Sequence, residues 1–358
     1  MSERRVQPLR VHGDRFVRPG MLDFAVNIWP TPHPRALRSA LIDAVQDSGY
    51  PDESAARLAL ARRHRRDPAE VLTLNGACEA FWLLAHALPG RRAACVHPSF
   101  TEAEAALRQS AGSVTHVMRP SGDWALDPQQ VPADAELVVL ANPNNPTGNL
   151  DPPARIAQLA RAGRTLVVDE SFIDFVPGER ASLAQRRDLP GLVVLRSLTK
   201  LWNLAGVRAG YLLGPAELVA RLREHRQPWS VSSPALAAIG ACAPDLHTPA
   251  RVAAEVAAAR EDLCRRLAQL DGVRCWPAQA NFVLLQVRNG AELVARLAGE
   301  GIAVRPCQSF PGLDADHIRL AVRTPAQHAV LAAAIARARE RLDDGERVRD
   351  PSRLLRRP

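Results

Sequence analysis

The residue best suited to chemistry is Lys200, because it is the only lysine in a chain of 358 residues whose lysines and arginines number 46. The arginines cannot replace it as a nucleophile. A guanidinium stays protonated at any accessible pH, whereas an amine can lose its proton and form an imine with a carbonyl. A compositional bias toward arginine leaves a surviving surface lysine as the plain alternative, but the neighbouring residues 197–211 favour a reactive amine.

Short apolar runs alternate with helical patterns through the middle of the chain. This alternation predicts crossover connections and a largely parallel sheet, in which ligands sit beyond the carboxyl ends of the strands. Polar and turn-forming residues stand at those ends, so the sequence predicts a site there. The runs are 71–74, 93–97, 137–141, 165–169, 192–195 and 209–213, and the residues at their ends are Asn75-Gly76-Ala77, Pro98-Ser99-Phe100, 142–148, Asp169 and 197–200.

The chain divides into an arm, two domains and a tail. Prolines 30, 32 and 34 forbid helix in the first segment, and helical spacing begins directly after it, at 35–48 and 53–65. After residue 244 a long helix up to 270, strands at 281–287, 302–305 and 318–322 and a final helix predict a smaller α+β domain. The expected units are an N-terminal arm on the small domain and active site (1–34), a large domain (35–243), a small domain (244–342) and a disordered basic tail (343–358).

The composition indicates a globular protein with hydrophobic content of 47%, ample for a buried core. No apolar stretch of about 20 residues occurs and no apolar run follows the N-terminus, so we expect a cytoplasmic protein without a membrane partner. The six cysteines are scattered, without a Cys-x-x-Cys pair or a histidine cluster at ligand spacing, which predicts reduced thiols and no metal. The charge of +8 suits a phosphate-bearing small molecule as well as nucleic acid. Because the arginines are spread along helices and condensed only in the tail, we expect no nucleic-acid partner.

Three motifs follow one another in a fixed order: Asn142-Pro143-Asn144-Asn145-Pro146-Thr147-Gly148, then Asp169-Glu170-Ser171-Phe172, then Ser197-Leu198-Thr199-Lys200 with Arg208 eight residues on. Together they resemble the fold-type I pyridoxal 5'-phosphate (PLP) enzymes of the class I/II aminotransferase family, over nearly the whole chain up to Arg323. The resemblance implies an α/β fold with a mostly parallel seven-stranded sheet between helices, a smaller α+β domain, and PLP as the cofactor.

The resemblance also implies roles around the cofactor ring. Lys200 would hold the aldehyde of PLP and move the proton at the α-carbon of the substrate, and Asp169 would keep the ring nitrogen protonated. Asn145 would donate to the phenolic oxygen and Phe100 would stack on the ring. A helix cap, a plain turn and a core position are the structural alternatives for the last three. Phe172 stands where related enzymes usually have a tyrosine, so this chain lacks one donor to the phenolic oxygen.

At the phosphate end, the family pattern places the cofactor on the backbone amides of Ala77 and Cys78 at a helix N-terminus, with Ser197 and Arg208 adding a hydroxyl and a positive charge. The charge of Arg208 is also expected to lower the pKa of the catalytic amine. Tyr50, one of two tyrosines, matches a residue that reaches the phosphate of the neighbouring subunit in relatives. The resemblance therefore implies a homodimer with shared active sites.

On the substrate side, Arg319 matches the family arginine that binds a carboxylate in a two-pronged manner. Arg323, Arg305, Asn27 and His12 are candidates for a second anionic group of the substrate. For each of them a solvated surface position is the alternative. An arginine-rich substrate side suits a small phosphorylated amino compound.

Within the family, the arm and residues 169–175 look most like the threonine-phosphate decarboxylases of cobalamin biosynthesis, which is our first interpretation. Histidinol-phosphate aminotransferases, which use glutamate and 2-oxoglutarate, are the alternative. The two reactions differ in which bond at the α-carbon is aligned, and the sequence leaves this open. A PLP-binding transcription regulator would need a DNA-binding region before the arm, and only about ten residues precede His12.

Overall fold

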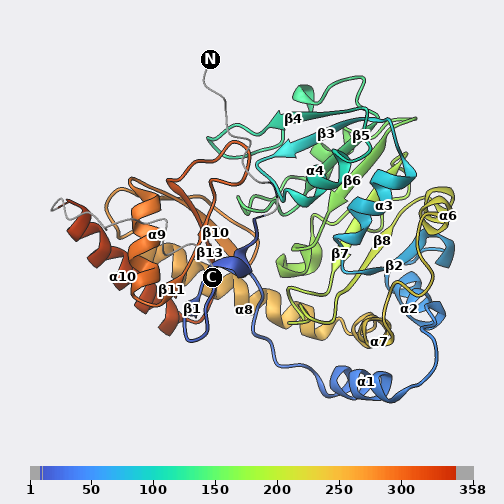
Figure 1. The fold of residues 1–358 in the computed structure, drawn as a ribbon, viewed down its shortest axis with the longest axis horizontal. Helices are drawn as coiled ribbons and strands as arrows, with labels where there is room; N and C mark the ends of the chain where they lie inside the picture. Colours follow the sequence, from blue (N-terminus) through green and yellow to red (C-terminus); the bar gives the residue numbers. More distant parts are fainter. Residues whose placement is uncertain (1–8, 10, 344–358) are drawn as a thin grey trace.

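The structure is a computed structural model that describes residue 9 and residues 11–343 (Figure 1). Its centre is a seven-stranded sheet with the order β2-β8-β7-β6-β5-β3-β4. Strand β8 runs antiparallel to both of its neighbours, and the other pairings are parallel. The strands are β2 (Val71–Asn75), β3 (Arg92–His97), β4 (Ser113–Met118), β5 (Leu137–Ala141), β6 (Thr165–Asp169), β7 (Leu192–Ser197) and β8 (Ala209–Leu213).

This sheet is buried on both faces, which explains the continuous apolar runs in its strands. Successive side chains point to opposite faces, so Val138 and Leu140 of β5 belong to one hydrophobic core while Leu137 and Val139 belong to another. The helices of this large domain are α1 (Arg35–Gln46), α2 (Ser54–His64), α3 (Glu79–Ala87), α4 (Glu102–Leu107), α5 (Pro153–Ala157), α6 (Ala216–Glu224) and α7 (Ser233–Cys242).

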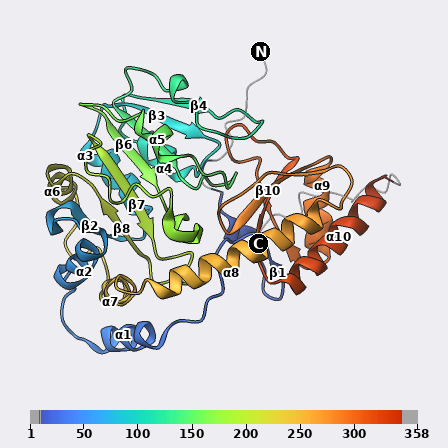
Figure 2. The ribbon, with the colours of Figure 1, turned by 180° about the vertical axis from the view of Figure 1, so that it is seen from behind.

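A smaller domain contains a four-stranded antiparallel sheet with the order β12-β13-β10-β9 and its own hydrophobic core. Helix α8 leads from the large domain to this sheet, and α9 and α10 lie beyond it (Figure 2). The elements are α8 (His247–Leu267), β9 (Val273–Cys275), β10 (Phe282–Val287), α9 (Gly290–Gly299), β11 (Ile302–Ala303), β12 (Arg305–Pro306), β13 (His317–Ala321) and α10 (Pro325–Asp343).

The N-terminal arm is attached to the small domain. Its strand β1 (Leu22–Asp23) pairs in parallel with β11, and Phe24 is fully buried in the core of that domain. Arg323 fastens the arm further, because its guanidinium donates to the backbone carbonyls of Asp23, Val26 and Ile28. The arm is thereby held by residues that lie about 300 positions later in the chain.

Most of the expected elements are found, and the differences have physical reasons. The sequence prediction missed β4, an edge strand whose side chains are mostly solvent-accessible, and the short strand β9. The expected single strand at 302–305 is split into β11 and β12, which belong to different sheets. The helix after residue 244 ends at Leu267, three residues earlier than expected. The expected tail lies outside the described residues, apart from Asp343.

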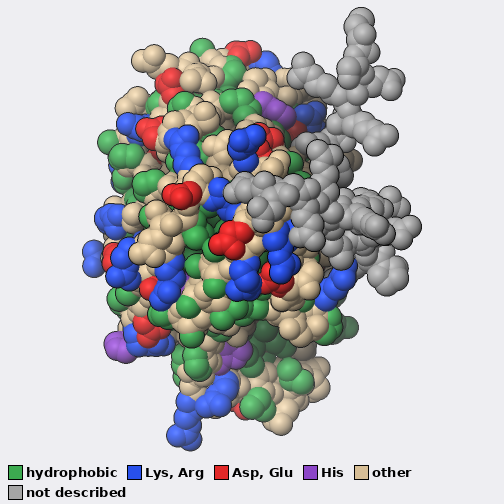
Figure 3. Space-filling model, turned by 90° about the vertical axis from the view of Figure 1, so that its left-hand side faces the viewer, with side chains coloured by type: hydrophobic (Ala, Val, Ile, Leu, Met, Phe, Trp, Pro, Cys, Tyr) green, Lys and Arg blue, Asp and Glu red, His purple; other side chains and the backbone are tan. Residues whose placement is uncertain are grey.

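Within residues 11–343 no helix is long and apolar enough to cross a membrane. On the face shown in Figure 3, arginine side chains lie interspersed with aspartates and glutamates instead of forming one continuous basic patch. This distribution on that face matches the sequence interpretation, in which the arginines are spread along helices.

Replacement of Arg323 is expected to loosen the arm. Arg323→Ala removes the donors of three arm carbonyls and should lower the free energy of unfolding by roughly 3 kcal/mol, since hydrogen bonds to charged groups are the stronger ones. Urea unfolding measures the stability, and limited proteolysis should find new cleavage at residues 11–28. Arg337→Ala is the control, because Arg337 is about half exposed and pairs with Glu300 at the surface. Equal resistance to protease in both variants would contradict the anchoring role.

Candidate active site

A cavity of about 440 Å³ opens at the carboxyl ends of β3, β5, β6 and β7, between the large sheet, the arm and the small domain. Its position is the one expected for a ligand site in a parallel sheet, where the strand ends and following loops meet. The cavity brings together most of the residues that the sequence singles out: His12, Asn27, Cys78, Phe100, Asn145, Asp169, Phe172, Lys200, Arg208, Arg305 and Arg319.

Lys200 presents an amine with no bound acceptor. Within the described residues Nζ makes no hydrogen bond or ion pair, and it lies 6.0 Å from the centre of the Phe172 ring. Burial lowers the pKa of Lys200 to about 8, with further contributions from the charges of Arg319 and Arg208. The sequence prediction named Arg208 as the cause, but burial has the larger effect. The unprotonated amine is therefore far more abundant near neutral pH than it would be for an ordinary lysine.

Asp169 ends β6 and supplies a carboxylate to the same cavity. Its Oδ1 accepts from the Ser171 backbone nitrogen at 2.9 Å and from the Ser171 hydroxyl at 2.5 Å. Burial nevertheless raises the pKa of Asp169, so a cationic group bound beside it would be stabilised. The sequence prediction did not assign a role to Ser171, although a serine two residues after an aspartate is a familiar turn signal that could have identified it.

Arg319 and Asn145 form one unit across the cavity. Arg319 Nη1 donates to Asn145 Oδ1 at 2.6 Å, and Nη2 donates to the carbonyl of Ala25 at 2.8 Å. Because Oδ1 accepts from the arginine, the amide nitrogen of Asn145 is its remaining donor. The buried Nε of Arg319 has no partner in the described structure. Burial, followed by the charge of Arg305, lowers the pKa of Arg319 to about 9.

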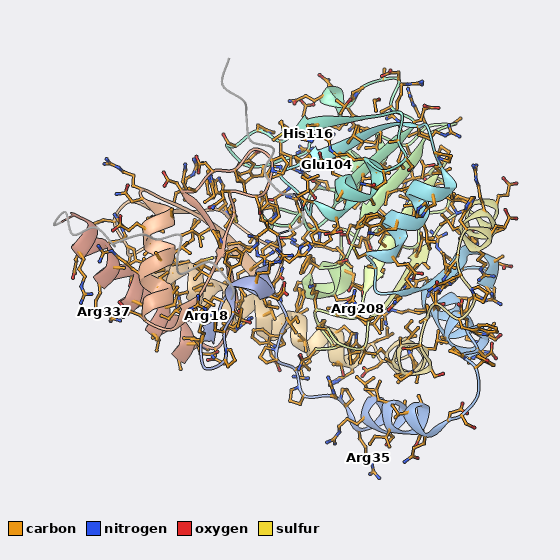
Figure 4. The ribbon with its side chains drawn as sticks, in the orientation of Figure 1. Arg18, Arg35, Glu104, His116, Arg208 and Arg337 are labelled. Atoms are coloured by element: carbon orange, nitrogen blue, oxygen red, sulfur yellow. The ribbon has the colours of Figure 1, made fainter. Side chains whose placement is uncertain are left out.

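The other end of the cavity meets the start of α3. Gly76 has a φ of 76°, a conformation that favours glycine, and an added Cβ there would lie 2.3 Å from Nη2 of Arg208, so this guanidinium lies against the turn that leads into α3. Arg208, labelled in Figure 4, thus stands beside the positive end of a helix, an arrangement that suits an anion. Of the other predicted residues at this end, Cys78 lines the cavity, whereas Ala77 and Ser197 do not.

A wall of the cavity is formed by Phe100 and the arm. The rings of Phe100 and His12 lie 5.7 Å apart, and His12 Nε2 is 2.8 Å from Glu102 Oε1. Glu102 begins α4 directly after the segment that carries Phe100. Sequence reasoning missed Glu102, because nothing in its local pattern distinguishes it from an ordinary acidic residue in the first turn of a helix.

Two of the predicted substrate residues differ in whether their side chains already have protein partners. Arg305 donates to Pro306, Val11 and Ser309 and lies about 5 Å from the Phe16 and Phe310 rings. Asn27 is buried, with Nδ2 unpaired among the described residues.

Besides Ala77 and Ser197, two further predicted residues do not line the cavity. The donors of Arg323 are used by the arm, which argues for anchoring instead of substrate binding. Tyr50 is 79% exposed and stacks on Trp229 with ring centres 4.5 Å apart, so within this chain it does not reach the site.

An amine, a carboxylate and a helix N-terminus around one cavity at this edge of a mostly parallel seven-stranded sheet define the class of fold-type I PLP-dependent enzymes. The sequence profile described as "Aminotransferase class I and II" matches residues 19–335. The chain belongs to this family, and the fold class and the cofactor predicted from the sequence are confirmed.

The chain is similar to proteins with two different names. It is 44% identical over 336 residues to a histidinol-phosphate aminotransferase of Mycobacterium tuberculosis, with 91% of this chain and 90% of that protein covered. It is 37% identical over 334 residues to the threonine-phosphate decarboxylase of Salmonella typhimurium, with 88% and 90% covered. The crystal structure of L-threonine-O-3-phosphate decarboxylase from Porphyromonas gingivalis matches with a TM-score of 0.81 and 26% identity, covering 89% of this chain and 100% of that one.

Lys200 should react with the aldehyde of PLP as an amine of unusually low pKa. In protein stripped of PLP, the rate of covalent attachment should rise with pH and reach half of its maximum near pH 8, because the unprotonated amine is the nucleophile, instead of reaching it near the ordinary value of 10.5. Stopped-flow absorbance measures this rate.

In Lys200→Ala, borohydride reduction followed by denaturation should leave no cofactor attached to the chain. Attachment that persists in this variant, or a wild-type rate that reaches half of its maximum only near pH 10.5, would contradict the assignment.

Proposed function

We propose that the cavity binds PLP with its ring between Phe100 and the strand ends. Bound PLP supplies an electron-withdrawing ring that stabilises negative charge at the α-carbon of an amine substrate. Asp169 would hold the ring nitrogen protonated, and the amide nitrogen of Asn145 would donate to the phenolic oxygen. Arg208, with the first turn of α3 and the nearby Ala77, Cys78 and Ser197, would hold the phosphate. The raised pKa of Asp169 supports this role, since a protonated ring nitrogen compensates its burial.

The substrate that we propose is a small amino acid carrying a phosphate, and the reaction is decarboxylation of the O-phosphothreonine type. The observation that carries this proposal is the pair Arg305 and Arg319, which are register neighbours on β12 and β13 and line one cavity. Arg208 lies near the cofactor phosphate, so two further cations remain for the substrate. A carboxylate and a phosphate on one small molecule match them.

In this reaction the protein would hold the bond between the α-carbon and the carboxylate perpendicular to the cofactor ring. The Arg319–Asn145 unit would fix the carboxylate end, and Arg305 with His12 would attract the phosphate. Once the substrate amine has taken its place, the Lys200 amine is free to hold or deliver the proton at the α-carbon. Phe172, in contact with Phe282 at 5.0 Å between ring centres, gives this side of the cavity an apolar wall.

Transamination of histidinol phosphate is the second candidate. Its support is the 44% identity to a protein named for that reaction, compared with 37% to the named decarboxylase. Glutamate, the other substrate of such a reaction, also carries two carboxylates that would suit the two arginines. The two candidates share the cofactor residues and differ in the substrate and in which bond of its α-carbon is broken.

Parallel assays distinguish the two candidates. With O-phosphothreonine we expect CO₂ release, and with histidinol phosphate and 2-oxoglutarate we expect little glutamate. Arg305→Gln should raise KM for the phosphorylated substrate roughly tenfold or more, because an ionic contact is lost. The exposed Arg288→Gln is the control. Glutamate formation without CO₂ release would favour transamination, and inactivity with both compounds would refute both assignments.

We also propose that the active enzyme is a homodimer in which Tyr50 completes the cofactor site of its partner. Tyr50 and Trp229 form a stacked aromatic pair that is 79% and 59% exposed, and Ile42 and Val45 of α1 are also exposed. Apolar side chains grouped at a surface are typical of an interface. The phenol hydroxyl of Tyr50 could then reach a phosphate that its own chain does not approach.

Tyr50→Ala should weaken PLP retention roughly tenfold, the size expected for one lost hydrogen bond to a charged group. Equilibrium dialysis measures retention, and sedimentation measures the oligomeric state. Val330→Ala, an exposed apolar position on α10, serves as the matched control. A monomeric wild-type holoenzyme, or unchanged retention in Tyr50→Ala, would contradict the shared site.

A further inference from the structure

Outside the cavity, two histidines and a glutamate meet at the edge of the large sheet. His97 is the last residue of β3. Glu104 lies in α4 and His116 in the edge strand β4, and both are labelled in Figure 4. The nitrogen and oxygen donors of the three side chains all lie within 4.8 Å of one another. The sequence predicted no metal site, because these residues are 7 and 12 positions apart and match no ligand spacing.

The sheet register explains why these residues meet. Strands β3 and β4 are parallel, with Cys95 opposite His116 and His97 opposite Met118. Side chains two residues apart point to the same face, so His97 and His116 are diagonal neighbours on one face of the sheet. Helix α4 packs against this part of β3 and brings Glu104 between them.

The donor atoms are close enough to share one ion. Glu104 Oε2 lies 3.0 Å from His97 Nε2, and Glu104 Oε1 lies 2.7 Å from His116 Nε2. Zinc binds imidazole nitrogen and carboxylate oxygen at about 2.0–2.2 Å, which sets the donors of a tetrahedral site roughly 3.3 Å apart. Both Glu104–histidine contacts are slightly shorter than this spacing, so the carboxylate and the rings would move apart a little to admit an ion.

The buried members of this cluster have unused polar atoms. His97 and Glu104 are each 1% exposed, yet both ring nitrogens of His97 and Oε2 of Glu104 have no hydrogen-bond partner among the described residues. The approach of His97 to Glu104 has the distance of an ion pair but not the angles of a hydrogen bond. His97 Nε2 and Glu104 Oε2 therefore face only each other, and Nδ1 of His97 has no partner among the described residues, which is unusual for buried polar atoms.

We propose that His97, Glu104 and His116 bind a divalent transition-metal ion of the zinc type. Two imidazoles and one carboxylate form a donor set that zinc accepts, with a fourth position left for water. The side chain of His116 is 35% exposed, which gives the ion and this water a path from solvent. The ion would connect β3, β4 and α4 beside the segment that carries Phe100, and it would not touch the reacting atoms.

The guanidinium of Arg108 lies where it would compete with the proposed ion for Glu104. Its Nε lies 2.7 Å and its Nη2 2.5 Å from Glu104 Oε1, the same oxygen that approaches His116. The Arg108 side chain is 48% exposed, so it can turn outward into water. Metal and guanidinium would compete for one carboxylate oxygen, and removal of the guanidinium should strengthen metal binding.

Titration of the tag-free holoenzyme tests this proposal, after dialysis against a chelator and with zinc chloride alone as the probe. Calorimetry should find one equivalent of Zn²⁺ per chain. His116→Ala should weaken binding roughly 100-fold or more, since even outer partners of a metal site contribute 10–100-fold. Zinc should also raise the melting temperature of the wild type but not of His116→Ala.

Matched variants separate binding at this cluster from zinc binding at a surface histidine elsewhere. His86→Ala removes an exposed histidine of α3 and should leave zinc binding unchanged. If His116→Ala folds poorly, Glu104→Gln is the substitute, because it keeps the side-chain shape and should still lose zinc binding. Arg108→Gln should bind zinc more tightly. Absence of one-to-one binding to the wild type, equal affinity in His116→Ala, or unchanged or weaker affinity in Arg108→Gln would overturn the proposal.

Discussion

The hydrogen bonds of Arg319 are the interaction on which the arrangement of the cavity depends. Arg319 belongs to the small domain, its Nη1 binds Asn145 of the large domain, and its Nη2 binds the carbonyl of Ala25 in the arm. One buried cation therefore fixes three parts of the chain relative to one another at the point where they enclose the site. The side chain is 4% exposed, and a buried guanidinium that lost these acceptors would be strongly destabilising.

The cavity carries an excess of positive charge. Lys200, Arg208, Arg305 and Arg319 line it, and Asp14, Glu102 and Asp169 are the acidic side chains on its wall. Of these, Glu102 is occupied with His12. Mutual repulsion in a poorly solvated space contributes to the lowered pKa values of Lys200 and Arg319. An anionic cofactor and an anionic substrate would relieve this repulsion, which is the physical reason why the site suits phosphate-bearing compounds.

The sequence predicts the parts of the fold whose pattern is local and whose environment is uniform. Strands β5, β6 and β8 have the predicted bounds because they are buried on both faces and read as continuous apolar runs. Strand β4 was missed because Ser113, Thr115 and His116 lie at a partly solvated edge, where such a run is not required.

The site follows the same rule. Asp169 ends a strand and Asn145 and Lys200 lie in the short segments after two others, so their motifs allow roles to be predicted for them. The contacts of Glu102 with His12 and of Arg323 with the arm join residues 90 and about 300 positions apart, and no local pattern encodes them. The meeting of His97, Glu104 and His116 is a third case, because it depends on the register of β3 with β4.

The attachment of the arm sets an order of events during synthesis. The arm contacts β11, Arg319 and Arg323, which emerge from the ribosome about 300 residues later. At a synthesis rate of about 5–20 residues per second, the arm waits roughly 15 to 60 s for its partners. The large domain can fold in this interval, whereas the wall formed by the arm comes last. A nascent chain truncated before β11 would therefore carry Lys200 in an open site, without the strand that pairs with the arm and without the small-domain residues that line the cavity.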